Sequence, residues 1–168
     1  MISFSDAIAI RNIFLLIVLG VCNISYASDY GGGITAHARA DYATALQLFN
    51  KAAAQGNVDA RLMLGYMYAN GQGSALNYNE AVRHWKLAAA QRNVRAQANL
   101  GIAYFKGQGA VKSYMLAYMW LSLASIEGDM NFIRIRDTVL ALMTPRQIAE
   151  AQKLATECQA RNFKGCDR

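Results

Sequence analysis

The sequence predicts an all-α protein, a solenoid of antiparallel helix pairs. A ten-residue phrase occurs twice, as LGYMYANGQG from Leu64 and as LGIAYFKGQG from Leu100. The two copies begin 36 residues apart, and a fixed period of about 20 to 50 residues is typical of stacked repeats. The composition agrees: 54% of residues are hydrophobic, and a single proline among 13 glycines suits helices joined by glycine turns.

The phrase predicts one packed helix and its exit turn. Its leucine and tyrosine stand four residues apart, so they share one helical face. Gly65 and Gly101 fall inside the helix, where glycine costs about 1 kcal/mol relative to alanine, so we expect them to permit close approach of another helix. Gly71 and Gly107 stand where a left-handed C-cap favours glycine. The GQG string therefore predicts a turn and no phosphate site.

The first residues, 1–27, predict a signal peptide. Arg11 precedes an apolar run that is too short to span a bilayer, and small residues end the segment. We expect cleavage between Ala27 and Ser28 and an exported protein, periplasmic or secreted. Two membrane-anchored alternatives stay open: lipidation at Cys22, although valine precedes it where a lipobox needs a small residue, and an uncleaved signal anchor.

The remaining chain divides into three parts. Residues 28–37 are expected to be a flexible N-terminal segment, because the run Gly31–Gly33 disfavours a helix. Residues 38–129 form the predicted solenoid, a partial repeat followed by full repeats at 57–92 and 93–128, and 130–168 supply capping helices. About seven helices are expected. One is the first helix of the second repeat, and the other six are expected at roughly 38–55, 59–70, 78–91, 113–127, 131–143 and 145–161.

Three helix starts have local signals. Asn77 and Ser113 occupy the same cap position in successive repeats. Thr144 followed by Pro145, with Gln147 three residues after the threonine, predicts a capping box and the start of the last helix.

The repeat unit, A-x-x-x-L-G-x-x-Y-x-x-G-x-G followed by a helix with Ala and Trp ahead of paired alanines, resembles the Sel-1-like repeat family. The resemblance covers about Asp41 to Asp129, and the ending MTPRQIAEAQKLA is similar to that of exported bacterial members. It implies a right-handed α-solenoid akin to tetratricopeptide arrays, used as an adaptor. The residues of the first repeat that carry it are Ala60, Leu64, Gly65, Tyr68, Gly71, Gly73, Ala81, Trp85, Ala88 and Ala89.

Two cysteines remain after removal of the leader, Cys158 and Cys166. On one continuous helix they would stand about 12 Å apart, far beyond the roughly 5.5 Å of a disulfide, so a bond requires the chain to turn near Asn162 and Gly165. A disulfide and two free thiols both stay open. Some cysteine-rich members of the resembled family carry such pairs, with seven intervening residues, in every repeat, and are linked with penicillin binding and β-lactam hydrolysis.

The charge and the titratable residues predict no nucleic-acid site, no metal site and no cofactor. The net charge of +6 is carried by Lys and Arg scattered over helix surfaces, which permits weak association with anionic envelope surfaces. His37 and His84 stand far from the cysteines, so no set of zinc ligands converges. His84 is interpreted as a surface residue, and no catalytic residue is predicted.

The remaining candidate is a concave groove for an extended peptide. We expect a monomeric, non-enzymatic adaptor for a protein or peptide. Two alternatives are a β-lactam-binding or β-lactam-hydrolysing protein and a structural accessory subunit of an envelope complex. The residues expected to face the groove are Leu62, Tyr66, Asn70, Arg95, Ile102, Phe105 and Lys106.

Overall fold

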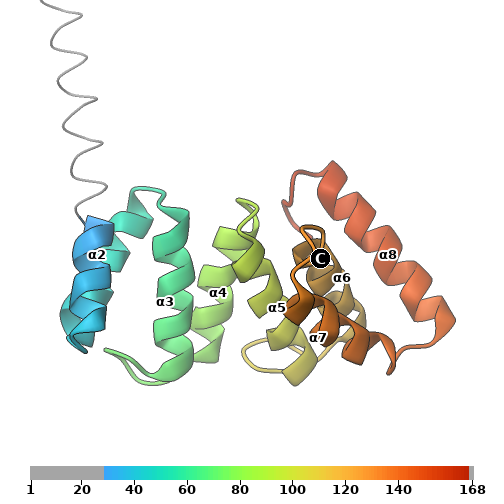
Figure 1. Cartoon of the computed structure of the whole chain (residues 1–168), viewed down its shortest axis with the longest axis horizontal. Helices are drawn as coiled ribbons and strands as arrows, with labels where there is room; N and C mark the ends of the chain where they lie inside the picture. The colour runs from blue at the N-terminus through green and yellow to red at the C-terminus, as the bar shows by residue number, and fades with distance from the viewer. Residues whose placement is uncertain (1–28, 167–168) are drawn as a thin grey trace, which may run out of the picture.

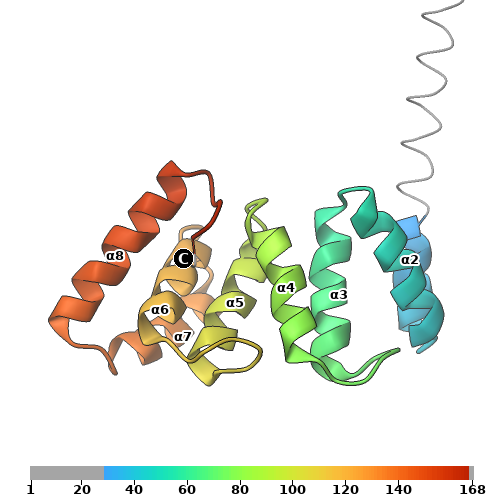
Figure 2. The ribbon, with the colours of Figure 1, turned by 180° about the vertical axis from the view of Figure 1, so that it is seen from behind.

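The computed structural model describes residues 29–166, and this part of the chain contains helices and no strand. Figure 1 shows α2 to α6 standing side by side in a row, with α8 leaning away at the far end; Figure 2 shows the same row from behind. From α2 to α7 each helix packs against the next along the chain, which confirms the predicted all-α repeat solenoid. After a helical stretch at 29–38, the helices are α2 (Tyr42–Ala54), α3 (Val58–Asn70), α4 (Tyr78–Ala89), α5 (Val94–Lys106), α6 (Tyr114–Ala124), α7 (Met130–Leu140) and α8 (Pro145–Ala160).

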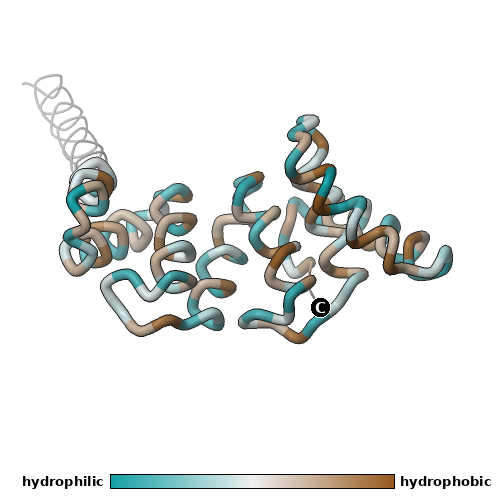
Figure 3. Tube along the Cα trace, turned by 60° about the horizontal axis from the view of Figure 1, so that its bottom comes forward, coloured by the Kyte–Doolittle hydropathy of each residue, from teal (hydrophilic) through white to brown (hydrophobic). Residues whose placement is uncertain are grey.

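The helix starts follow the predicted signals. The side chains of Asn77 and Ser113 accept hydrogen bonds from backbone N–H groups in the first turns of α4 and α6. Thr144 and Gln147 form the reciprocal capping box at the start of α8, with Pro145 as its first residue. Figure 3 shows hydrophobic and hydrophilic residues interleaved along the helices, as amphipathic helices require.

The mid-helix glycines of the repeated phrase are packing positions, as predicted. A Cβ atom on Gly65 would strike the indole of Trp85, and one on Gly101 would lie 2.6 Å from Cγ of Leu121. The two contacts are equivalent, because both partners stand 20 residues after their glycine on the second helix of the pair. Each glycine thus lets the two helices of one repeat approach closely.

The expectation of a flexible segment at 28–37 is wrong for its described part, which is helical from 29 to 38. Gly33 lies against the ring of Phe49, where a Cβ atom would be 2.6 Å from a ring carbon. Gly33 therefore serves close packing of this helix on α2, and that packing outweighs the low helix propensity of the glycine run. The stretch ends before Ala40, whose φ is 59°, so α2 begins a few residues later than expected.

The second glycine of each GQG turn makes a contact that the sequence did not predict. Gly73 and Gly109 have φ of 74° and 70°. A Cβ atom on Gly73 would meet the backbone carbonyl of Tyr42, and one on Gly109 would meet that of Tyr78. Since these tyrosines are the first residues of α2 and α4, each turn rests on the preceding helix pair and joins consecutive repeats.

The end of the chain folds back onto the repeats. Both α7 and α8 pack against α6, and a disulfide joins Cys158 to Cys166 with their Cα atoms 5.1 Å apart. The intervening turn contains Asn162, which accepts a hydrogen bond of 3.0 Å from Nη2 of Arg92, and Phe163, whose ring centroid lies 5.3 Å from the same guanidinium. We call residues 158–166 the C-terminal hairpin.

The predicted signal peptide, its cleavage site between Ala27 and Ser28, and Cys22 lie outside the described residues. Within residues 29–166, none of the helices has the length and apolar character needed to cross a membrane.

Candidate functional site

The predicted groove residues lie on α3 and α5, which begin alike with asparagine caps at Asn57 and Asn93. The Arg95 guanidinium lies 5.8 Å from the ring centroid of Tyr66, so the two repeats contribute one residue each to a cation–π pair. The Tyr66 ring also meets the Trp85 ring edge-on, at 6.0 Å between centroids. We call the exposed and half-buried positions Tyr66, Asn70, Arg95, Ile102 and Lys106 the α3–α5 surface.

Two predicted groove residues are engaged elsewhere. Leu62 is 3% exposed and belongs to the core, so its expected place in the groove is wrong; it packs inward at the same repeat position as the buried Ala98. Phe105 is half-buried, and its ring centroid lies 6.0 Å from that of Tyr114, over which Lys112 Nζ stands at 5.1 Å. Phe105 thus supports the turn between α5 and α6.

Tyr30 is a neighbour of this surface that the sequence did not predict. Its pKa is raised from 10.0 by partial burial and by the negative charge of Asp59, against an opposing effect of Arg95. Asp59 also accepts a hydrogen bond of 3.2 Å from Nδ2 of Asn93. The sequence did not predict Tyr30 because it stands in the segment expected to be flexible. Phe49 aligns with Trp85 at the 36-residue period, and this alignment would have indicated that a packed helix precedes α2.

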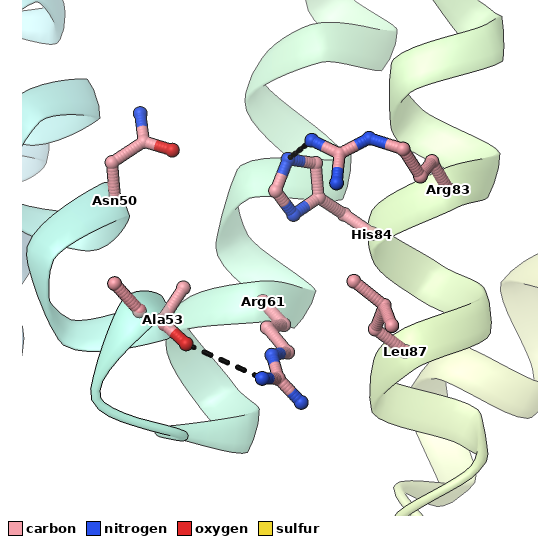
Figure 4. A pocket seen from close by; sticks show the side chains of 7 residues that line it. Asn50, Ala53, Arg61, Arg83, His84 and Leu87 are labelled. Carbon is pink, nitrogen blue, oxygen red and sulfur yellow. Dashed lines mark hydrogen bonds between the residues drawn. The ribbon is translucent and has the colours of Figure 1, made fainter.

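A second site is a pocket of about 210 Å³ between α2, α3 and α4 (Figure 4). Arg61 and Tyr66 are five residues apart on α3, so their side chains leave the helix about 140° apart. The pocket and the α3–α5 surface therefore lie on different sides of α3. The pocket is lined by Asn50, Ala53, Ala54, Arg61, Arg83, His84 and Leu87, a set rich in hydrogen-bond donors.

His84 is the most buried titratable group of this pocket, and its interpretation as a surface residue is wrong. It is 5% exposed, with its ring stacked on Tyr68 at 5.5 Å between centroids. Burial lowers its pKa from 6.5 to about 4, assisted by the positive charges of Arg83 and Arg61 and opposed by Glu80. The imidazole is therefore neutral at pH 7. Arg83 Nη2 donates to its Nε2 over 3.0 Å and also pairs with Glu80.

Residues 29–166 contain no group of three or more His, Cys, Asp or Glu side chains placed to hold a metal ion. His37 instead lies near Gln72, with 3.2 Å between its Nε2 and the amide oxygen, and its ring meets that of Tyr42 edge-on. Cys158 and Cys166 are buried in their disulfide. The absence of a catalytic residue and of a cofactor stays a prediction.

Comparison with solved structures places the fold among bacterial repeat proteins. A protective antigen of uropathogenic Escherichia coli, with an SLR fold, superposes with a TM-score of 0.75 at 24% identity, over 82% of this chain and 31% of the antigen. A Sel1 repeat protein from Oxalobacter formigenes superposes with a TM-score of 0.60 at 29% identity, over 63% of this chain and 44% of that protein. The chain thus spans less than half the length of either.

No curated protein sequence matches the chain significantly. The family model of the Sel1 repeat, in contrast, matches three times, at residues 19–57, 58–93 and 94–129. The first match includes the helix pair of 29–38 and α2, which lacks the GQG turn of the two later repeats. These matches cover more than half of the sequence, and the chain belongs to the Sel1 repeat family.

Proposed function

We propose that the protein is a non-enzymatic, exported adaptor that binds a peptide or protein segment on the α3–α5 surface. The observation that carries this proposal is the pair formed by Tyr66 and Arg95, one from each of two successive repeats. Tyr66 is half-buried and held by Trp85, so a partner would meet a ring that is already ordered. Aromatic residues beside arginine are the side chains that most often dominate binding energy at protein interfaces.

The charges indicate the chemistry of the partner. Arg95 and Lys106 are exposed on the surface, and Ile102 adds an apolar position between them. An extended segment that alternates acidic and apolar residues would match this order. The net charge of +6 favours approach of an acidic partner, and also permits salt-sensitive association with anionic envelope surfaces.

Export is part of the proposal. The segment 1–27 has the order of a signal peptide, and the disulfide between Cys158 and Cys166 suits an oxidising compartment such as the periplasm. Fractionation of cells followed by N-terminal sequencing tests this directly. A mature chain that begins at Ser28 in the periplasm or medium is expected, and a full-length chain in the cytoplasm would contradict export.

The binding test is affinity purification from envelope extract with the wild type, the double variant Tyr66→Ala with Arg95→Gln, and Arg39→Gln. Arg39 is exposed, so its replacement removes the same charge away from the surface in question. A partner retained by wild type and Arg39→Gln but lost by the double variant is expected. Equal retention by all three, with crosslinks from Arg83 instead, would favour an accessory subunit docked through another face and contradict the adaptor surface.

The enzymatic alternative rests on the single disulfide with seven intervening residues, which lies in the C-terminal hairpin and outside the repeats. Purified protein is tested for nitrocefin hydrolysis and for labelling by a fluorescent penicillin. The adaptor proposal expects neither reaction. Hydrolysis that is lost in a Cys158→Ala, Cys166→Ala variant would overturn the non-enzymatic assignment. Light scattering of the same sample tests the expected monomer.

A further inference from the structure

We propose that the pocket between α2, α3 and α4 is a binding site for a carboxylate group carried on a small apolar stem. The site is separate from the α3–α5 surface and does not depend on the adaptor proposal. Its ligand chemistry follows from three observations: a comparison with the next repeat, an unpartnered N–H donor, and one uncompensated positive charge.

The next repeat shows that the scaffold does not need polar residues here. The three polar pocket residues of α3 and α4 have equivalents 36 residues later, all of them buried. In the next repeat the fold thus packs the amide of Gln97 and the large apolar side chains of Met119 and Trp120 at these positions. His84 is buried and Arg61 is half-buried, whereas Arg83 is exposed. A buried histidine beside a half-buried arginine is a costlier choice for packing than an amide and an indole, so their presence points to a ligand. The pairs are Arg61 with Gln97, Arg83 with Met119, and His84 with Trp120.

The His84 imidazole presents a donor that nothing in residues 29–166 accepts. Arginine can only donate, so the bond from Arg83 makes Nε2 the acceptor and places the single ring proton of neutral His84 on Nδ1. Nδ1 is buried and has no hydrogen-bond partner. Trp85 and Trp120 also carry unpartnered nitrogens, but these indoles belong to the core. His84 lines the pocket, and Figure 4 shows its Nδ1 edge turned towards the side of Ala53 and Arg61.

The charge balance selects a monoanion. Glu80 Oε2 lies 2.7 Å from Arg83, so it neutralises that arginine. The only hydrogen bond of Arg61 within the described chain is to the carbonyl of Ala53, at 3.4 Å, and no carboxylate there pairs with it. One positive charge beside one N–H donor matches a carboxylate, while Glu80 would repel a dianion such as phosphate.

The rest of the pocket sets the size and shape of the ligand. Ala53, Ala54 and Leu87 form its apolar wall, and 210 Å³ accommodates only a few heavy atoms beyond the carboxylate. The amide nitrogen of Asn50 is engaged with the carbonyl of Leu46 at 2.8 Å, which leaves the Asn50 oxygen as an acceptor at the rim. A peptide N–H that precedes a C-terminal carboxylate would donate to this Asn50 oxygen. A free short-chain acid has no such N–H and would bind only to Arg61 and to the Nδ1–H of His84.

The test is a titration of the ¹⁵N-labelled full chain, followed through the imidazole signals of His84. The probes are N-acetyl-alanyl-alanine, the same dipeptide as its C-terminal amide, butyrate and inorganic phosphate. The free acid is expected to shift the Nδ1–H signal of His84, and the amide is expected to leave it unchanged. Butyrate binding as tightly as the dipeptide would identify a free small acid as the source, and a clear preference for the dipeptide would identify a chain terminus.

Variants make the proposal falsifiable. Arg61→Gln introduces the residue that the next repeat carries at this position, so the fold should accept it; it is expected to weaken binding of the free acid about tenfold or more. His84→Phe keeps a ring against Tyr68, removes the donor and should weaken binding similarly. Arg95→Gln is the matched control, with the same charge change on the α3–α5 surface, and should bind normally.

Three results would overturn the carboxylate site. The amide could bind as well as the acid, phosphate could bind more tightly than either acid, or Arg61→Gln could bind like wild type. Because Arg95→Gln affects the adaptor surface and Arg61→Gln affects the pocket, failure of one proposal is distinguishable from failure of the other.

Discussion

The two junctions between consecutive repeats, α2–α3–α4 and α4–α5–α6, share their backbone contacts and differ in their side chains. Gly73 and Gly109 make the same contact with the preceding helix pair. At the side chains, His84 in the first junction corresponds to Trp120 in the second. The glycines on which the backbone path depends recur with the period, and the polar pocket residues Arg61, Arg83 and His84 do not. Binding chemistry should therefore be sought among the latter.

The second junction also differs in what covers it. A cavity of about 220 Å³ lies at this junction and is lined in part by Arg92 and by Phe163 of the C-terminal hairpin. The corresponding pocket of the first junction has no such cover from the described chain. The C-terminal hairpin thus forms part of the wall of the second cavity and no part of the first pocket.

The largest expected effect tests the shared backbone contact. Gly109→Ala should lower the free energy of unfolding by about 3 kcal/mol or more, because the new Cβ meets the Tyr78 carbonyl and φ is positive. Urea denaturation measures it. Gly128→Ala is the matched control, since its φ is also positive, at 83°, but nothing lies within 4 Å. Equal losses in the two variants would show that the contact between repeats contributes nothing.

The next effect is a pH dependence of stability that arises at the first junction, from His84. The pKa of His84 is about 4 in the folded chain and near 6.5 when unfolded, so the unfolded chain binds more protons between these values. Stability should therefore fall as the pH falls through this window, by about 3 kcal/mol from pH 7 to pH 4. Denaturation at a series of pH values measures it. His84→Phe should lack this component, and parallel pH curves for the two proteins would contradict the neutral, buried imidazole.

A smaller effect is expected from the disulfide. The Cys158→Ala, Cys166→Ala variant should lose about 2 kcal/mol, since the bond closes a short loop. Hydrogen exchange should rise around the turn between α4 and α5, where Arg92 contacts the hairpin, and stay unchanged at His84. Equal changes at both junctions would contradict the idea that the hairpin covers only the second.

The smallest effect is on the α3–α5 surface. Arg95→Gln should cost no more than about 1 kcal/mol, because the guanidinium that pairs with Tyr66 is exposed to solvent. Thermal denaturation against Arg39→Gln measures the difference. A loss comparable to that of Gly109→Ala would mean that Arg95 holds the repeats together and would weaken its assignment to binding.

Most of the fold was predictable because its signals are local. The caps at Asn77, Ser113 and Thr144 depend on neighbouring residues, and the period placed the helices. The helix at 29–38 was missed because a glycine run indicates flexibility until the facing Phe49 is known.

The candidate sites were less predictable because they depend on which residues meet across repeats. The pairing of Tyr66 with Arg95 joins two predicted residues, whereas Leu62 turned inward. The burial of His84 was recoverable in principle, since the period aligns it with Trp120, a residue type typical of cores. The pocket itself required the positions of α2, α3 and α4 together.

The contact of Gly73 and Gly109 with main-chain carbonyls has a consequence for the evolution of such proteins. The surface that each turn meets is backbone, so it is the same whatever amino acid follows the helix cap of the preceding pair. At this contact, a duplicated unit can therefore attach to another without a matching side chain. Arrays of different lengths, and units exchanged between paralogues, would keep the same step from one repeat to the next while their pockets diverge.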